Sequence, residues 1–144
     1  MNTKRTVLFL CTGNSARSQM AEGWLRQLGG DRFDVASAGT KPVGLNPLAV
    51  QVMQEVGIDI AHHRSKHIDE LSDRAFDLVI TVCDQVKETC PLFATAQTML
   101  HWSFEDPAAV EGALEARLAC FRRVRDEIGQ TITQWLHTQE PPNR

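Results

Sequence analysis

Apolar and polar positions follow two patterns that take turns along the chain. Short apolar runs bounded by polar or turn residues are typical of buried strands. They occur at residues 6–10, 33–39, 76–82 and, more weakly, 97–102. Between and after them, apolar residues recur three or four positions apart, as they do on one face of a helix. The pattern therefore predicts strands and helices in alternation.

Three segments have the apolar spacing of a helix. The first follows the turn "CTGNSAR" and ends at Gly29, the second runs from Pro47 to Gly57, and the third spans residues 113–136. Proline suits the first turn of a helix and glycine its end, which supports the bounds of the second helix. A shorter helical piece is expected at residues 65–71.

This alternation, without repeats, linkers or low-complexity segments, predicts a single α/β domain over residues 1–144. The expected architecture is one open sheet of four parallel strands with helices on both faces. Ligands of such sheets bind outside the carboxyl ends of the strands. Cys11 and Cys83 each follow a predicted strand, so we expect both to open onto one crevice.

Composition limits the classes of function. The chain has 144 residues, of which 42% are hydrophobic and 23% charged, as in a soluble globular protein. Its net charge of −3 argues against nucleic-acid binding. No apolar run approaches the ~20 residues of a membrane span, and the N-terminal run is too short for a signal peptide. We therefore expect a cytoplasmic protein, where four cysteines are catalytic, metal-binding or buried more often than disulfide-bonded.

The turn "CTGNSARS" joins the first predicted strand to the first helix. Its backbone N–H groups would curve around a point in front of the helix N-terminus, where tetrahedral anions bind. Arg17 can add a bidentate contact, while Cys11 at the floor would be a thiolate nucleophile to which the Ser18 hydroxyl donates a hydrogen bond. The expected oxyanion-binding residues are Thr12, Gly13, Asn14, Ser15, Ala16 and Arg17.

The segment "CTGNSARSQMAEG" resembles the active-site loop of the low-molecular-weight protein tyrosine phosphatase fold. Within that fold the chain is most similar to the arsenate reductases that thioredoxin recycles. The resemblance covers nearly the whole chain. Phosphatases of this fold do not typically share the two later cysteines, Cys83 and Cys90. The resemblance rests also on the segments "SAGT", "NPLAVQVMQEVGIDI", "DLVITVCDQVKETCP", "HWSFEDPA" and "RRVRDEIG".

The two later cysteines suggest a disulfide relay. Cys83 is expected to attack the sulfur of a Cys11–arsenic adduct, after which Cys90 attacks Cys83 and moves the disulfide outward. If residues 83–90 are helical, their ends lie about 10 Å apart, whereas a disulfide requires Cα atoms within about 7 Å. The segment would then have to unwind, which predicts a redox switch. Zinc binding is not expected, because no C-x-x-C spacing is present.

Asp106 lies in "FEDPA", and the resemblance implies that this Asp is the general acid for the leaving oxygen. The neighbouring Glu105 is an alternative acid. Ala108 stands where a phosphatase of this fold often has an aromatic residue that flanks phosphotyrosine, which argues against that substrate.

In some thioredoxin-coupled reductases a potassium ion supports the loop. The resemblance places Asn14, Glu22 and Ser37 at its ligand positions, and Lys66 where those proteins have an Asp. A lysine ammonium could take the place of the cation, which predicts weak or absent potassium dependence. Solvated charges at Glu22 and Lys66 are the alternative. No tightly bound cofactor is expected.

The leading hypothesis is an arsenate reductase for which phosphate and sulfate are competing oxyanions. Thioredoxin is the expected electron donor, and a glutathione–glutaredoxin couple is the alternative. A second hypothesis is a phosphatase that uses Cys11, Arg17 and Asp106 while the later thiols stay idle. A third is a non-enzymatic redox or oxyanion sensor that changes shape when Cys83 and Cys90 pair.

Overall fold

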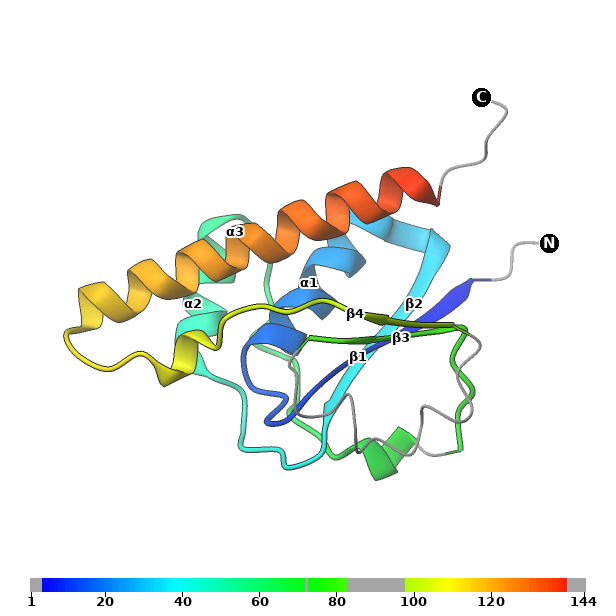
Figure 1. Cartoon of the computed structure of the whole chain (residues 1–144), viewed down its shortest axis with the longest axis horizontal. Coiled ribbons are helices and arrows are strands. Elements are labelled where there is room, and N and C mark those ends of the chain that lie inside the picture. The colour runs from blue at the N-terminus through cyan, green and yellow to red at the C-terminus, as the bar shows by residue number, and fades with distance from the viewer. Residues whose placement is uncertain (1–3, 72, 83–97, 140–144) are drawn as a thin grey trace.

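The computed structural model describes residues 4–71, 73–82 and 98–139 and contains a four-stranded, fully parallel sheet (Figure 1). The strand order is β2-β1-β3-β4, so that β1 and β3 lie inside the sheet. The predicted parallel architecture is confirmed. The strands are β1 (Arg5–Cys11), β2 (Phe33–Gly39), β3 (Leu78–Thr81) and β4 (Thr98–His101).

Helices α1 and α3 pack together along one side of the sheet, and a short 3-10 helix lies on the other side of the strands in Figure 1. The three longer helices predicted from the sequence are present, and α3 runs two residues beyond its predicted end. The short piece predicted at residues 65–71 forms only a 3-10 turn over its last four residues. The described helices are α1 (Arg17–Gly29), α2 (Pro47–Glu55) and α3 (Leu114–Thr138), with 3-10 turns at Gly30–Arg32, Ile68–Leu71 and Pro107–Ala109. None of these helices is long and apolar enough to cross a membrane.

The core explains why these segments fold as they do. Residues 7–10 of β1 are fully buried, as expected for an inner strand covered on both faces. In α3, the apolar residues Phe121, Val124 and Ile128 are fully buried as well, whereas Leu114 at the start of the helix is 54% exposed. Helix α2 begins with Pro47, and the side chain of Asn46 caps it by accepting a hydrogen bond from the N–H of Leu48 at 2.8 Å.

The third strand is shorter than the sequence pattern predicts. Residues 76–82 were expected to form it, but the ladder spans only Leu78–Thr81. Asp77 uses its carboxylate instead, accepting a hydrogen bond from the N–H of Thr6 at 2.9 Å. The apolar run predicts burial rather than strand pairing, and Phe76 and Val82 are buried although they lie outside the strand.

The carboxyl ends of the strands converge on one edge of the sheet. Cys11, the last residue of β1, lies beside Gly39, the last residue of β2. Beyond the end of β3, the N–H of Val82 donates to the carbonyl of Leu10 at 2.9 Å. This edge therefore holds the first cysteine and the residue that precedes Cys83 in the chain.

Candidate functional site

The loop between β1 and α1 is held from outside through its carbonyl groups. Five consecutive carbonyls, those of residues 12–16, each accept a hydrogen bond. Three of the donors are backbone N–H groups of the segment at residues 41–46, which follows β2. The donors are Lys41 N for Thr12 at 2.8 Å, Val43 N for Gly13 at 3.1 Å, Gln19 Nε2 for Asn14 at 3.1 Å, Asn46 N for Ser15 at 3.0 Å and Met20 N for Ala16 at 2.8 Å.

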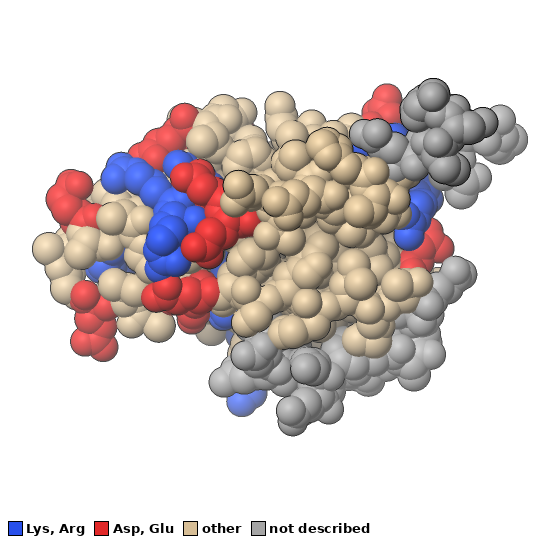
Figure 2. All heavy atoms as spheres, turned by 45° about the horizontal axis from the view of Figure 1, so that its top comes forward, with Lys and Arg blue, Asp and Glu red and all other residues tan. Residues whose placement is uncertain are grey.

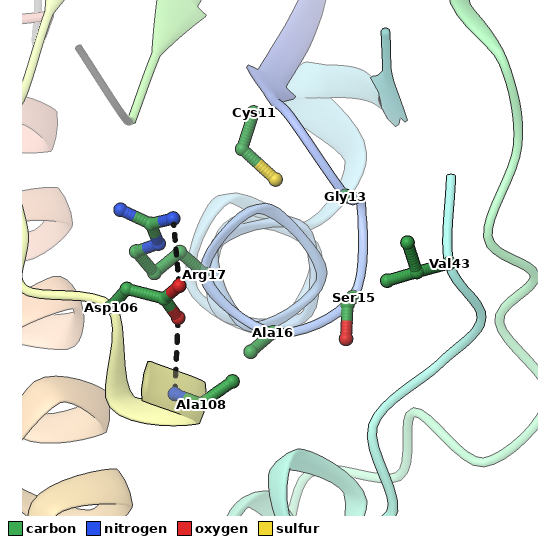
Figure 3. A pocket seen from close by; sticks show the side chains of 8 residues that line it. All are labelled: Cys11, Gly13, Ser15, Ala16, Arg17, Val43, Asp106 and Ala108. Carbon is green, nitrogen blue, oxygen red and sulfur yellow. Dashed lines mark hydrogen bonds and ion pairs between the residues drawn. The ribbon is translucent and has the colours of Figure 1, made fainter. Parts of the chain in front are cut away.

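This outward anchoring dictates the direction of the loop's N–H groups. In a trans peptide the C=O and the following N–H point to opposite sides, and no described peptide bond is cis. The N–H groups of residues 13–17 therefore point away from the outer donors. The Asn14 N–H meets the sulfur of Cys11, and Gly13, Ser15, Ala16 and Arg17 line a pocket over that sulfur (Figure 3). Such a concavity of N–H groups at a helix N-terminus binds anions.

Asn14 forms the bend of this loop. Its φ of 47° is the only positive value at a described residue other than glycine, and its side chain is fully buried. The amide nitrogen donates to Ser18 Oγ at 2.8 Å and to Ser37 Oγ at 3.0 Å, and the amide oxygen accepts from Lys66 N at 2.9 Å. With Gln19 Nε2 as a second donor to that oxygen, the side chain is saturated, which stabilises the left-handed backbone.

The Cys11 sulfur is the end point of this network. Ser18 Oγ lies 2.9 Å from it, and the Asn14 N–H donates to it at 3.1 Å. Ser18 already accepts a hydrogen bond from the Asn14 amide, so the proton of its hydroxyl is available for the sulfur. Both interactions therefore place hydrogen-bond donors at the Cys11 sulfur.

Arg17 closes the pocket on the side of β4. Its guanidinium donates to the carbonyl of Phe104 at 3.1 Å and lies 3.6 Å from the Asp106 carboxylate. The Arg17 side chain is only 15% exposed. The other carboxylate oxygen of Asp106 accepts from the N–H of Ala108 at 3.0 Å, as Figure 3 shows. In this state Arg17 is paired with a residue that lines the same pocket.

The two candidate acids face different partners. Asp106 lines the pocket with Cys11 and Arg17. Glu105 instead forms an ion pair with Arg123 of α3. Ala108 also lines the pocket, so a small side chain stands where the sequence comparison suggested an aromatic one in phosphatases.

The residues predicted to support the loop lie behind it. Ser37 Oγ donates to the carboxylate of Glu22 at 2.6 Å, and Arg26 Nε donates to the same carboxylate at 2.9 Å. The ammonium of Lys66 donates to the backbone carbonyls of Ser37 at 2.9 Å and Arg64 at 3.0 Å. Burial lowers the pKa of Lys66, and the charge of Glu22 opposes that shift. Glu22 is buried and Lys66 is half-buried, and both are hydrogen-bonded behind the loop rather than solvated.

Sequence analysis did not identify Gln19, Val43 or His63 as parts of the site. Gln19 is fully buried, and its amide oxygen accepts a hydrogen bond from His63 Nδ1 at 3.0 Å. Its amide nitrogen donates to the side-chain oxygen of Asn14. Burial lowers the pKa of His63, so the neutral ring is the donor. Val43 lines the pocket although it is 74% exposed. Val43 and His63 belong to no motif, and Gln19, although it lies in "CTGNSARSQMAEG", has no residue type that marks its role; only the folded loop brings the three together.

Comparison with known proteins places this geometry in a family. Residues 6–141 match the model of the low molecular weight phosphotyrosine protein phosphatase family. The chain belongs to that family. It is 48% identical over 135 residues to an arsenate reductase of Halalkalibacterium halodurans, covering 94% of this chain and 97% of the relative. The resemblance inferred from the sequence is therefore confirmed.

Solved structures of arsenate reductases have a similar fold. An arsenate reductase in the phosphate binding state has a TM-score of 0.80 at 32% identity, covering 93% of this chain and 98% of the other. The Corynebacterium glutamicum thioredoxin-dependent arsenate reductase has a TM-score of 0.64 at 27% identity, covering 91% of this chain and 63% of the other.

Two predicted site residues of this family member, Cys83 and Cys90, lie outside the described residues. The remaining cysteine, Cys120, is buried in α3 beside the apolar stripe, as predicted. Burial raises the pKa of its thiol, which suits a packed side chain rather than a nucleophile.

Replacing Ser18 with Ala tests the hydrogen bond to the sulfur. A hydrogen bond to a charged group contributes about 1.5–3 kcal/mol, so we expect alkylation of Cys11 by iodoacetamide at pH 6 to slow about ten- to a hundredfold. Peptide mapping by mass spectrometry reports the rate at Cys11 alone. Ser103→Ala, at an exposed position, is the control. An unchanged rate in Ser18→Ala would contradict the assigned donor.

Replacing Gly39 with Ala tests the packing behind the loop. A Cβ there would lie 2.5 Å from the Thr12 carbonyl oxygen and 2.9 Å from the Asn14 nitrogen, so the loop has to move. We expect phosphate affinity, measured by calorimetric titration, to fall at least about tenfold, which corresponds to 1.4 kcal/mol. Gly57→Ala, which is strained at φ 83° but lies at the far end of α2, is the control. Equal phosphate affinities of the two variants would refute the packing argument.

Proposed function

We propose that this protein reduces arsenate to arsenite through a covalent adduct on Cys11. The observation that carries the proposal is the Cys11 sulfur, which accepts two hydrogen bonds at the floor of a pocket lined by loop N–H groups and Arg17. The arsenate reductases to which the chain is similar match it over nearly its full length. Phosphate and sulfate, which are tetrahedral like arsenate, are expected to compete for the pocket.

In the first step Arg17 exchanges the Asp106 carboxylate for the incoming oxyanion. The inward N–H groups donate hydrogen bonds to the remaining oxygens of that oxyanion. The Cys11 thiolate attacks arsenic and forms an S–As bond. Asp106, released from Arg17, takes up a proton from solvent. One As–OH bond then breaks, and the hydroxyl leaves as water with the proton that Asp106 supplies. Arsenic remains As(V) at this stage.

In the second step the Cys83 thiolate attacks the sulfur of Cys11. The S–As bond breaks, and its electron pair leaves with arsenic, which becomes arsenite, As(III). The two sulfurs lose these two electrons and form the Cys11–Cys83 disulfide. The position of Val82 beside Leu10 supports this step, because Cys83 is the next residue and Cys11 follows Leu10.

In the third step Cys90 attacks Cys83, releases the Cys11 thiolate and leaves a Cys83–Cys90 disulfide. A dithiol reductant returns this disulfide to two thiols by supplying two electrons and two protons. We propose thioredoxin as that reductant, with the glutathione–glutaredoxin couple as the alternative. A structural relative is a thioredoxin-dependent arsenate reductase, which supports the choice. The chemistry requires no tightly bound cofactor and suits the reducing cytoplasm.

Single Cys-to-Ser variants test the relay. Without reductant, the wild type and Cys90→Ser should each release about one arsenite per protein. With thioredoxin, thioredoxin reductase and NADPH, only the wild type should turn over repeatedly. Cys83→Ser should release none, and Cys120→Ser, the matched control, should behave as wild type. Arsenite is quantified by chromatography with elemental mass detection, and disulfides by peptide mapping.

Other outcomes identify the competing functions. Repeated arsenite release by Cys90→Ser would contradict the relay. A wild type that hydrolyses p-nitrophenyl phosphate without reducing arsenate would point to the phosphatase. A wild type that forms the Cys83–Cys90 disulfide on oxidation but turns over neither substrate would point to the sensor. Replacing thioredoxin by glutaredoxin and glutathione in the wild-type assay separates the two electron donors.

We further propose that the ammonium of Lys66 serves in place of a potassium ion behind the loop. Its bonds to the carbonyls of Ser37 and Arg64 tie the end of β2 to the segment after α2. The Lys66 backbone N–H also holds the Asn14 amide oxygen, so the residue contacts the loop directly. Nearby, the Glu22 carboxylate supplies the opposite charge.

Lys66→Asp should create a response to potassium, because it replaces the fixed cation with an oxygen ligand. The wild-type melting temperature and turnover should be the same in sodium or potassium salts at one ionic strength. In Lys66→Asp both should rise with potassium, by about 2 °C or more in melting temperature. Lys66→Ala, which adds no ligand, should respond less. Potassium activation of the wild type would contradict the proposal.

A further inference from the structure

Three consecutive residues after β4, Phe104, Glu105 and Asp106, are held between two arginines. On the pocket side, Arg17 donates to the Phe104 carbonyl at 3.1 Å and faces the Asp106 carboxylate at 3.6 Å. On the opposite side, the Glu105 carboxylate is bound by Arg123 of α3. The segment thus carries the candidate acid, Asp106, and α3 holds the segment through the preceding residue, Glu105.

Arg123 is itself oriented for this contact. One end of its guanidinium donates to Glu127, one turn later on α3, at 3.1 Å, and the other reaches Glu105. The same nitrogen that binds Glu105 lies 3.5 Å from the sulfur of Cys120. The two carboxylates raise the pKa of Arg123, so the guanidinium stays charged. A planar fork that bridges two carboxylates resists rotation better than a lysine would.

The neighbouring Arg122 makes a similar ion pair that points elsewhere. It binds Glu55 of α2 at 2.8 Å, and its side chain is 40% exposed, against 49% for Arg123. Figure 2 shows acidic and basic side chains interleaved over this end of the molecule. Exposed pairs of this kind contribute little to stability. Two adjacent arginines with similar environments therefore differ mainly in which segment they hold.

We propose that Arg123 is a positioning residue for the oxyanion site. By holding Glu105 against α3, it fixes the Phe104–Asp106 segment so that the Asp106 carboxyl faces the oxygen that leaves arsenic. The inference rests on the proposed function for its reaction step. It assigns Glu105 to this contact rather than to proton transfer. Loss of Arg123 should slow proton donation while leaving the anion cup formed by the loop after β1 intact.

The test measures the first-order rate of arsenite release in single turnovers without reductant. Arg123→Ala should lower this rate about three- to tenfold, whereas the competitive inhibition constant of phosphate should change less than twofold. Arg122→Ala, the matched control, should leave both values at wild-type levels. Arg123→Lys should recover part of the rate, since it keeps one contact and the charge. Melting temperatures of the two alanine variants should be similar, because the ion pairs that each variant loses are exposed and contribute little to stability.

A double-variant cycle tests whether Arg123 acts through the acid. In an Asp106→Asn background, which lacks the acid, Arg123→Ala should have no further effect on the rate. A full additional loss in that background, or an equal loss in Arg122→Ala, would overturn the inference. So would a wild-type rate in Arg123→Ala. A wild type that releases no arsenite would instead refute the proposed function, and phosphate binding would still be measurable.

Discussion

The site depends on the hydrogen bonds that the loop carbonyls of residues 12–16 accept from outside. Those bonds come from the segment at residues 41–46, from Gln19 and from the first turn of α1. Because each peptide is planar and trans, satisfying the carbonyls on the outer side turns the N–H groups toward the pocket. The same contacts offset the cost of burying backbone polar groups in a tight turn. Anion binding is thus prepared before any ligand arrives.

The buried polar network extends this preparation to the sulfur. The Glu22 carboxylate orients the Ser37 hydroxyl, the Asn14 amide then donates to both serines, and Ser18 is left to donate to Cys11. Each donor direction follows from the one before it. The network therefore links the Glu22 carboxylate to the reactivity of the Cys11 thiol, and Lys66 and Arg26 balance its charge.

Arg17 and the segment after β4 supply the part of the site that has to change. In this state Arg17 is paired with Asp106, so an entering oxyanion competes with a carboxylate for the guanidinium. The exchange costs little because Asp106 is 44% exposed and hydrogen-bonded to the Ala108 N–H. A preorganised cup and an exchangeable arginine together favour oxyanions that bring enough charge to displace Asp106.

Much of this arrangement could be predicted from the sequence. Apolar periodicity located the four strands and the helices, since those elements bury one face or both. The turn "CTGNSARS" identified the anion loop because its residue types suit a strand-to-helix junction. Long-range partners could not be predicted. The segment at residues 41–46 contacts the loop through backbone groups that any residue possesses. Gln19 contacts it through a side-chain amide whose direction only the fold sets, and Glu105 pairs with Arg123 across 18 positions of the chain for the same reason.

The central claim, that inward N–H groups of this loop hold a tetrahedral oxyanion above the Cys11 sulfur, is tested most directly by nuclear magnetic resonance. The ¹⁵N-labelled protein is titrated with phosphate while the backbone amide signals are followed. We expect saturable shifts that are largest at residues 13–17 and that share one dissociation constant. Shifts confined to other segments, or none at phosphate concentrations that inhibit the enzyme, would contradict the account.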